Sequence, residues 1–171
     1  MNKVETILKK RAEILKTPLA EASQPGKQIE GLEFLLSDEK YAINSIFVSE
    51  VIYINELTKL PCTPPFIMGL INVRGKVLSV IDIKMFFNIP SKGITNLNKV
   101  IIVKYNDIEI GILADDILGN FNIQLEELQT EVTTITEVDD SFIIGVTNSR
   151  VVVLDIKKLL LSDIIVVNEV V

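Results

Sequence analysis

The chain contains no histidine, so Ser-His-Asp and Cys-His nucleophiles and histidine-ligated zinc are excluded. The single cysteine, Cys62, has no histidine to activate it, and we interpret it as a small residue in a turn. Carboxylates remain, including the adjacent pairs Asp115-Asp116 and Asp139-Asp140. Neighbouring side chains on a strand point to opposite faces, and acids in turns usually cap or bend the chain. The sequence therefore indicates no enzyme, no cofactor and no metal site.

Charge and composition limit the partners and the compartment. The net charge of −6 and the pI near 4.8 do not supply the basic field that nucleic-acid binding needs. The one basic run, Lys9-Lys10-Arg11, is interpreted as the solvated face of a helix. The first 17 residues lack the apolar centre of a signal peptide, and no apolar run approaches the roughly 20 residues that span a bilayer. Together with a single cysteine, this predicts a cytoplasmic protein that does not insert into a membrane.

The strongest local pattern is PCTPPFIMGLINVRGKVLSVID, residues 61–82. Its prolines, Pro61, Pro64 and Pro65, exclude a helix interior or a central strand on the approach. Two runs rich in β-branched residues then flank Arg74-Gly75, a hairpin turn signal. The pattern predicts two buried strands with Arg74 at the tip between them.

The rest of the chain predicts an all-β body with helical ends. Apolar residues from Val4 to Leu15 follow a helical spacing that Pro18 ends, and residues 18–28 form a linker. Asp155 is placed as the N-cap of a short C-terminal helix, and 84–87 as one helical turn. Strands are predicted at 30–36, 40–44, 46–54, 69–73, 76–82, 99–105, 108–113, 117–123, 141–147 and 150–154. A weak internal repeat is visible, since Ile81-Asp82 and Leu154-Asp155 each close a strand pair before a helical turn.

The motif of residues 61–82 resembles the central signature of the CheW-like coupling proteins of bacterial chemotaxis. The matching positions are Pro61, Pro64, Phe66, Ile67, Gly69, Asn72, Arg74, Gly75 and Asp82. Tyr41-Ala-Ile with Val48-Ser-Glu50-Val resembles a second element of that family, and Gly111-Ile-Leu-Ala-Asp115 a third. The resemblance extends over about residues 30 to 160, with departures at Ser79, where proline is frequent, and Lys84, where arginine is frequent.

The resemblance implies two packed five-stranded barrels of the Src-homology-3-like kind. We expect an extension of helix and linker over 1–28 and a two-barrel domain over 29–171. The boundary is expected near 88–98, with the first strand crossing to the second barrel as an option. The implied role is a non-enzymatic adaptor between the cytoplasmic hairpin tips of chemoreceptors and the regulatory domain of the CheA histidine kinase. Such a protein would be recruited to membrane-associated receptor arrays. The N-terminal helix is expected to be dispensable for coupling, with self-association through it left open.

The resemblance also assigns candidate residues to two surfaces. Receptor binding is expected at Val48, Glu50, Val51, Arg74 and Gly75, and kinase binding at Ile43, Ile46 and Val48. Two plainer interpretations remain open at this point: an exposed Glu50–Arg74 ion pair with no role in binding, and core packing of the three apolar residues. A different class of function, a ligand-binding or enzymatic barrel with a pocket between the halves, is the alternative.

Overall fold

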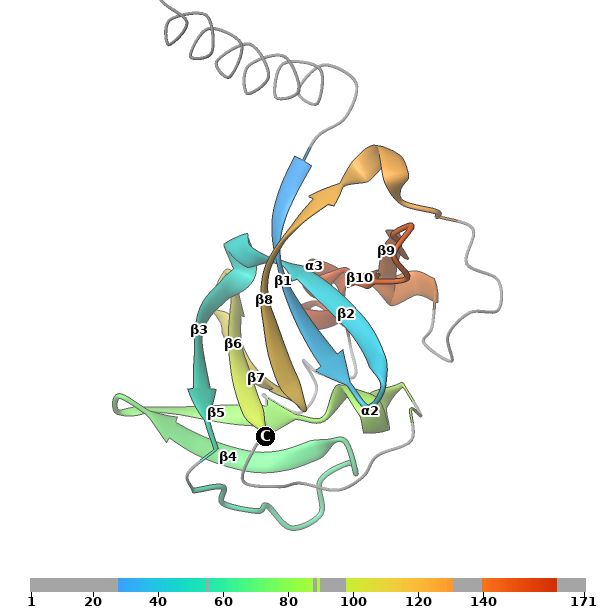
Figure 1. The fold of residues 1–171 in the computed structure, drawn as a ribbon. Coiled ribbons are helices and arrows are strands. Elements are labelled where there is room, and N and C mark those ends of the chain that lie inside the picture. The colour runs from blue at the N-terminus through green and yellow to red at the C-terminus, as the bar shows by residue number, and fades with distance from the viewer. Residues whose placement is uncertain (1–27, 55, 88, 90–97, 131–139, 163–171) are drawn as a thin grey trace, which may run out of the picture.

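The computed structural model describes residues 28–54, 56–87, 89, 98–130 and 140–162 (Figure 1). The helix predicted from Val4 to Leu15 lies outside these residues, as does Asp139 of the second acid pair. The described chain is built of strands with a few short helices, and these strands form two five-stranded sheets. The predicted all-β fold of two packed small barrels is confirmed.

The first sheet has the strand order β8-β1-β2-β10-β9. The bounds of its strands, in that order, are Asp116–Gln124, Gln28–Leu36, Glu39–Asn44, Val152–Leu154 and Ile143–Val146. The second sheet has the order β3-β6-β7-β5-β4. Its strands are Val48–Tyr53, Lys99–Tyr105, Ile108–Ala114, Lys76–Ile81 and Ile67–Val73. All ten strands predicted from the sequence are present, with ends that differ by a few residues.

Short helices occupy the strand junctions. The α-helices are α2 (Ile83–Phe86) and α3 (Ile156–Leu160), and the 3-10 turns are η1 (Ser45–Phe47), η2 (Leu125–Glu127) and η3 (Asp140–Phe142). The predicted cap of the C-terminal helix is confirmed, since the Asp155 carboxylate accepts a hydrogen bond from the Lys158 backbone N–H at 3.1 Å. Asp82 caps α2 in the same way, by accepting from the Lys84 backbone N–H at 3.0 Å.

The two sheets do not divide the chain at 88–98. The chain crosses from one sheet to the other between β2 and β3, and again between β7 and β8. Residues 88–98 instead separate two segments with the same order of elements: a hairpin, a strand, a second hairpin and a short helix. Each segment gives its first hairpin to the sheet of the other segment, so the whole β1–β2 hairpin crosses rather than the first strand alone.

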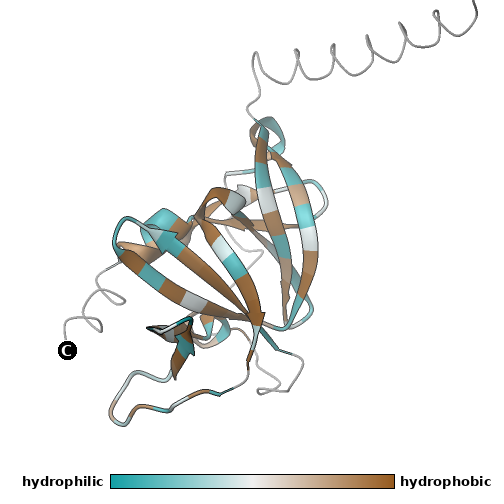
Figure 2. Cartoon of the chain, turned by 90° about the vertical axis from the view of Figure 1, so that its left-hand side faces the viewer, coloured by the Kyte–Doolittle hydropathy of each residue, from teal (hydrophilic) through white to brown (hydrophobic). Residues whose placement is uncertain are grey.

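This exchange explains the long apolar runs of the sequence. The central strands are buried on both faces, so that Ile101 and Val103 enter one apolar cluster while Val100 and Ile102 enter another. The largest cluster combines residues of both sheets and lies between them, and a smaller cluster fills each barrel. In Figure 2 several strands carry apolar and polar bands in turn along their length, the pattern expected where one face of a strand is covered and the other is not.

The second sheet is closed through the segment after β3. The backbone N–H groups of Thr58 and Leu70 each donate to the carbonyl oxygen of the other, at 2.9 and 2.8 Å. A side chain at Gly69 would collide with the Thr58 carbonyl, so a residue without Cβ is required for this approach. The two edges of the sheet, β3 and β4, are thereby brought toward each other.

Candidate functional site

Arg74 lies at the tip of the β4–β5 hairpin, as the sequence predicted. Arg74 and Gly75 have φ angles of 52° and 86°, the left-handed combination that a tight hairpin turn requires. The Asn72 side-chain oxygen accepts a hydrogen bond from the Gly75 backbone N–H at 3.0 Å and fixes the turn. The arginine is therefore presented to solvent on a short, defined support.

Glu50 and Arg74 touch. The Arg74 Nη2 atom lies 3.3 Å from Glu50 Oε2, with side chains that are 84% and 29% exposed. Glu50 belongs to β3 and Arg74 follows β4, the two strands at opposite ends of the sheet order. The contact therefore forms only because the sheet curls, and it joins the two edges of one barrel. An exposed pair of this kind contributes about 1 kcal/mol or less to stability.

Apolar residues are exposed beside this ion pair. Val51 and Tyr53 on β3 and Val77 on β5 are all exposed, whereas Val48 is half-buried and packs on the cluster between the sheets. The two valines of the predicted receptor site therefore differ in accessibility. Val51 is the accessible one, and its side chain leaves β3 on the face opposite to that of Glu50.

The predicted kinase-facing residues also differ in their exposure to solvent. Ile46 is 78% exposed at the centre of η1, where the chain crosses between the sheets. Ile43 is wholly buried in the cluster between the sheets, so its assignment to a contact surface is corrected. The physical reason is that β2 is an inner strand covered on both faces, and apolar content alone does not distinguish it from an exposed edge.

A buried ion pair joins the two barrels through residues that the sequence analysis did not connect. The Lys84 side chain on α2 is 1% exposed, and its Nζ lies 2.7 Å from Asp115 Oδ1. The same carboxylate accepts from the Ser37 backbone N–H at 2.6 Å and from Asn98 Nδ2 at 3.0 Å. These partners come from both sheets and from the crossing between β7 and β8. Asp115 falls on a family motif and Lys84 on a position where the family often has arginine, and these two positions were the available signal.

Asp82 lies next to this pair. Its side chain is buried, and burial raises the pKa of the Asp82 carboxyl above its ordinary value, an effect that the neighbouring Lys84 partly offsets. By contrast, the exposed Asp116 bonds to Lys99 Nζ at 3.2 Å, and this contact lowers the pKa of Asp116. Asp115 and Asp116 thus point to different partners, as predicted for adjacent acids.

Cys62 is exposed, and no group of three or more acid and cysteine side chains that could hold a metal occurs in the described part of the chain. Among the helices that the structure describes, none has the length and apolar character to cross a membrane. The feature that stands out is a surface: an ion pair at the edges of one barrel with exposed apolar residues around it.

Comparison with known proteins shows the family to which the chain is similar. A CheW-like domain model matches residues 30–163. The chemotaxis protein CheW of Klebsiella aerogenes is 29% identical over 153 residues, which cover 85% of this chain and 91% of that protein. The corresponding protein of Bacillus subtilis is 32% identical over 97 residues, 57% of this chain and 62% of that protein.

A solved structure has the same architecture. The crystal structure of the scaffolding protein TtCheW from Thermoanaerobacter tengcongensis superposes with a TM-score of 0.69 and 28% sequence identity. The superposition covers 79% of this chain and 89% of that one.

Proposed function

This chain belongs to the CheW-like family, and we propose that it is a chemotaxis adaptor that couples the cytoplasmic tips of chemoreceptors to the CheA histidine kinase. It acts by presenting surfaces and not by catalysing a reaction. Its place is the cytoplasm, at receptor arrays next to the membrane. The observation that carries the proposal is that signature residues of the family, Glu50 and Arg74, meet on one exposed edge.

The receptor is proposed to dock at the Glu50–Arg74 edge. A guanidinium has five N–H donors in a planar fork, and the contact with Glu50 leaves donors available for a carboxylate of a receptor helix. Glu50 holds the arginine in place, while Val51 supplies an apolar contact from the other face of the same edge strand. Gly75 keeps the turn narrow enough for a helix to approach.

The kinase is proposed to dock at the crossing between β2 and β3. Ile46 is the exposed apolar residue there, with Val48 half-buried behind it. Because small barrels can associate through apolar residues at strand ends, a regulatory domain with the same fold is a suitable partner for this surface. The two docking surfaces are neighbours in the chain, because Ile46 lies just before β3 and Glu50 is the third residue of that strand.

The barrels are suited to carry a signal between these surfaces as a rigid unit. Their shared apolar cluster and the buried Lys84–Asp115 pair oppose movement of one barrel against the other. A change in the receptor is then proposed to reach the kinase through the position of the assembly and not through a rearrangement inside this chain.

Reconstitution tests the proposal. The full chain, a receptor cytoplasmic fragment and the CheA kinase of the same organism are combined, and complex formation and kinase autophosphorylation are measured. We expect a ternary complex that requires this chain and kinase activity that responds to it. A chain that binds neither the receptor fragment nor the kinase would contradict the proposed function. The alternative of a ligand pocket between the barrels has no observation in its favour, since the pocket at Asp38 and Arg150 is formed by strands of a single sheet.

A further inference from the structure

The motif that carries Arg74 occurs a second time in the chain. Phe-Ile-x-Gly-x-x-Asn-x-Arg describes residues 66–74 and, with the same spacing, residues 142–150. Arg74 lies in the turn after β4 and Arg150 in the turn after β9, and their φ angles are 52° and 64°. The repeat therefore places a second arginine, in the same backbone conformation, at the tip of the β9–β10 hairpin of the other barrel.

The pairing of the strands shows which residues correspond. In one sheet Val48 pairs with Val103 and, across a bulge, Glu50 pairs with Ile102. In the other sheet Ile117 pairs with Phe34 and, across a bulge at the same place, Gly119 pairs with Glu33. The strand orders of the two sheets also correspond position by position. Gly119 is thus the counterpart of Glu50.

The second barrel therefore has the arginine without its acid. Arg74 is paired with Glu50, whereas the position that should face Arg150 is a glycine with no carboxylate. Arg150 is exposed, and its guanidinium takes part in none of the ion pairs found within the described residues. Within the described residues, Arg150 is therefore an exposed arginine on a fixed turn without a counter-ion.

The turn that carries Arg150 is held rigidly by Thr147. The Thr147 hydroxyl oxygen accepts from the Val151 backbone N–H at 3.1 Å, and its carbonyl oxygen accepts from the Arg150 backbone N–H at 3.0 Å. Thr147 itself is buried. The backbone of this turn therefore does not have to be ordered on binding, and it sets the direction in which the Arg150 side chain leaves the chain.

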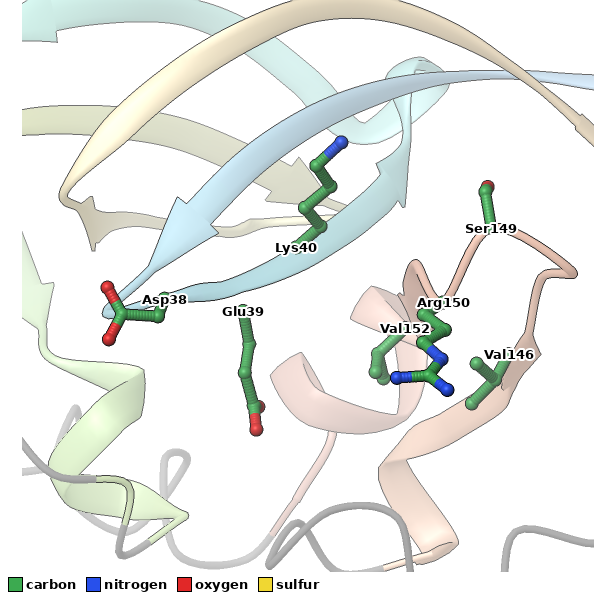
Figure 3. Close-up of a pocket in the computed structure, with 7 residues that line it drawn as sticks. All are labelled: Asp38, Glu39, Lys40, Val146, Ser149, Arg150 and Val152. Carbon is green, nitrogen blue, oxygen red and sulfur yellow. The ribbon is translucent and has the colours of Figure 1, made fainter.

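A pocket of about 430 Å³ opens beside this arginine (Figure 3). Its lining residues are Asp38, Glu39, Lys40, Val146, Ser149, Arg150 and Val152. In Figure 3 Arg150 and Glu39 extend in one direction while Lys40 extends in the other. Lys40 lies 3.7 Å from Glu33, and Glu39 accepts a hydrogen bond from the Tyr41 hydroxyl at 2.7 Å. Both therefore have partners inside the protein, in contrast to the Arg150 guanidinium.

We propose that this pocket is a second docking site, which binds a peptide segment of a partner protein through one carboxylate held by Arg150. The partner's acid would occupy the place that Glu50 occupies in the other barrel. Asp38 and Glu39 on the facing wall repel a multiply charged anion, so a single carboxylate is favoured over a phosphate or a nucleic acid. The site adds a third surface to the proposed adaptor and does not depend on which partners that adaptor has.

The proposal is tested by nuclear magnetic resonance on the ¹⁵N-labelled full chain. The probe is the capped tripeptide acetyl-Leu-Glu-Leu-amide, with acetyl-Leu-Gln-Leu-amide as the matched neutral control and sodium acetate as a free carboxylate. We expect the Glu peptide, and not the Gln peptide, to shift the Nε–Hε resonance of Arg150 in a saturable way. The Gln peptide, which has the same shape without the charge, is the control for contacts that do not depend on a carboxylate.

Variants separate binding from a loss of structure. In Arg150→Ala the shifts that the Glu peptide causes at the Ser149 and Val152 amides should disappear while the melting temperature stays unchanged. An unshifted Arg150 resonance, or equal shifts of Arg150 with the Glu and Gln peptides, would overturn the site. An equal effect of sodium acetate would overturn the assignment to a peptide. Because neither receptor nor kinase is present, failure here would leave the proposed adaptor function standing, and the reverse also holds.

Discussion

The buried Nζ of Lys84 lies 2.7 Å from Asp115 Oδ1, and this contact fastens one barrel to the other. Lys84 belongs to the helix that follows β5, and Asp115 lies at the crossing between the two sheets. The second oxygen of Asp115 binds the backbone of Ser37, in the turn between β1 and β2 of the opposite sheet. A charge pair with this geometry opposes separation of the exchanged hairpins.

Removal of the lysine charge should destabilise the fold strongly. Lys84→Met leaves Asp115 without its cation in a partly buried place, and we expect a loss of about 3 kcal/mol in the free energy of unfolding. Urea denaturation measures this loss. Lys76→Met is the matched control, because Lys76 forms an exposed pair with Glu109 at 3.4 Å and should lose less than about 1 kcal/mol. Equal losses in the two variants would contradict the role given to Lys84.

Reversal of the surface ion pair should affect binding more than stability. Arg74→Glu places two acids together at the proposed receptor edge, and we expect receptor affinity to fall about tenfold or more. The melting temperature should hardly change, since the exposed pair contributes little to stability. Calorimetric titration with a receptor fragment provides the measurement.

The double variant distinguishes a docking pair from a brace. Arg74→Glu with Glu50→Arg restores opposite charges in exchanged positions and should recover part of the lost affinity. Wild-type affinity in Arg74→Glu alone would remove Arg74 from the receptor site. Normal affinity with a lowered melting temperature would make the pair a structural brace of the barrel.

Asp82 should make stability depend on pH. Its pKa is raised above 3.8 in the folded state, so the folded protein holds this proton more tightly than the unfolded chain does. The favourable contribution is therefore complete below the unfolded value and is lost as pH rises through the folded pKa. Relative to Asp82→Asn, which does not titrate but can still cap α2, the wild type should lose stability as pH rises above the ordinary value of 3.8 and through the folded pKa. Urea denaturation of both proteins across this range checks the sign, and a wild type that gains stability relative to Asp82→Asn as pH rises would refute it.

A charge at Ile46 should weaken kinase binding without unfolding the chain. Ile46 is 78% exposed, so Ile46→Asp removes a surface contact and leaves the core intact, and about a tenfold loss of kinase affinity is expected. Leu118→Asp, at an exposed apolar position of the other barrel, is the control and should bind normally. Unchanged kinase affinity in a folded Ile46→Asp protein would exclude this residue from the surface.

Local features of the fold could be predicted from the sequence because they depend on neighbours in the chain. The turn at Arg74-Gly75 needs a left-handed backbone, and the caps at Asp82 and Asp155 need a short acceptor before a helical turn. The resemblance of residues 61–82 to a family motif supplied the barrels, which strand spacing alone does not specify. The second motif, at residues 142–150, is equally legible but stands in a shorter hairpin without the prolines.

By itself, the sequence determined the strands, the turns and the residues that form the Arg74 surface. Only the tertiary structure decided which strands pair, because pairing between distant segments depends on burial and closure across the whole molecule. That is why the β1–β2 hairpin joins the sheet of β8, β9 and β10, and why Glu50 reaches Arg74 from the opposite edge of a curled sheet. The tertiary structure also decided which isoleucine is accessible. Ile43 lies in the core and Ile46, three residues later, lies in solvent, because the chain leaves an inner strand between them.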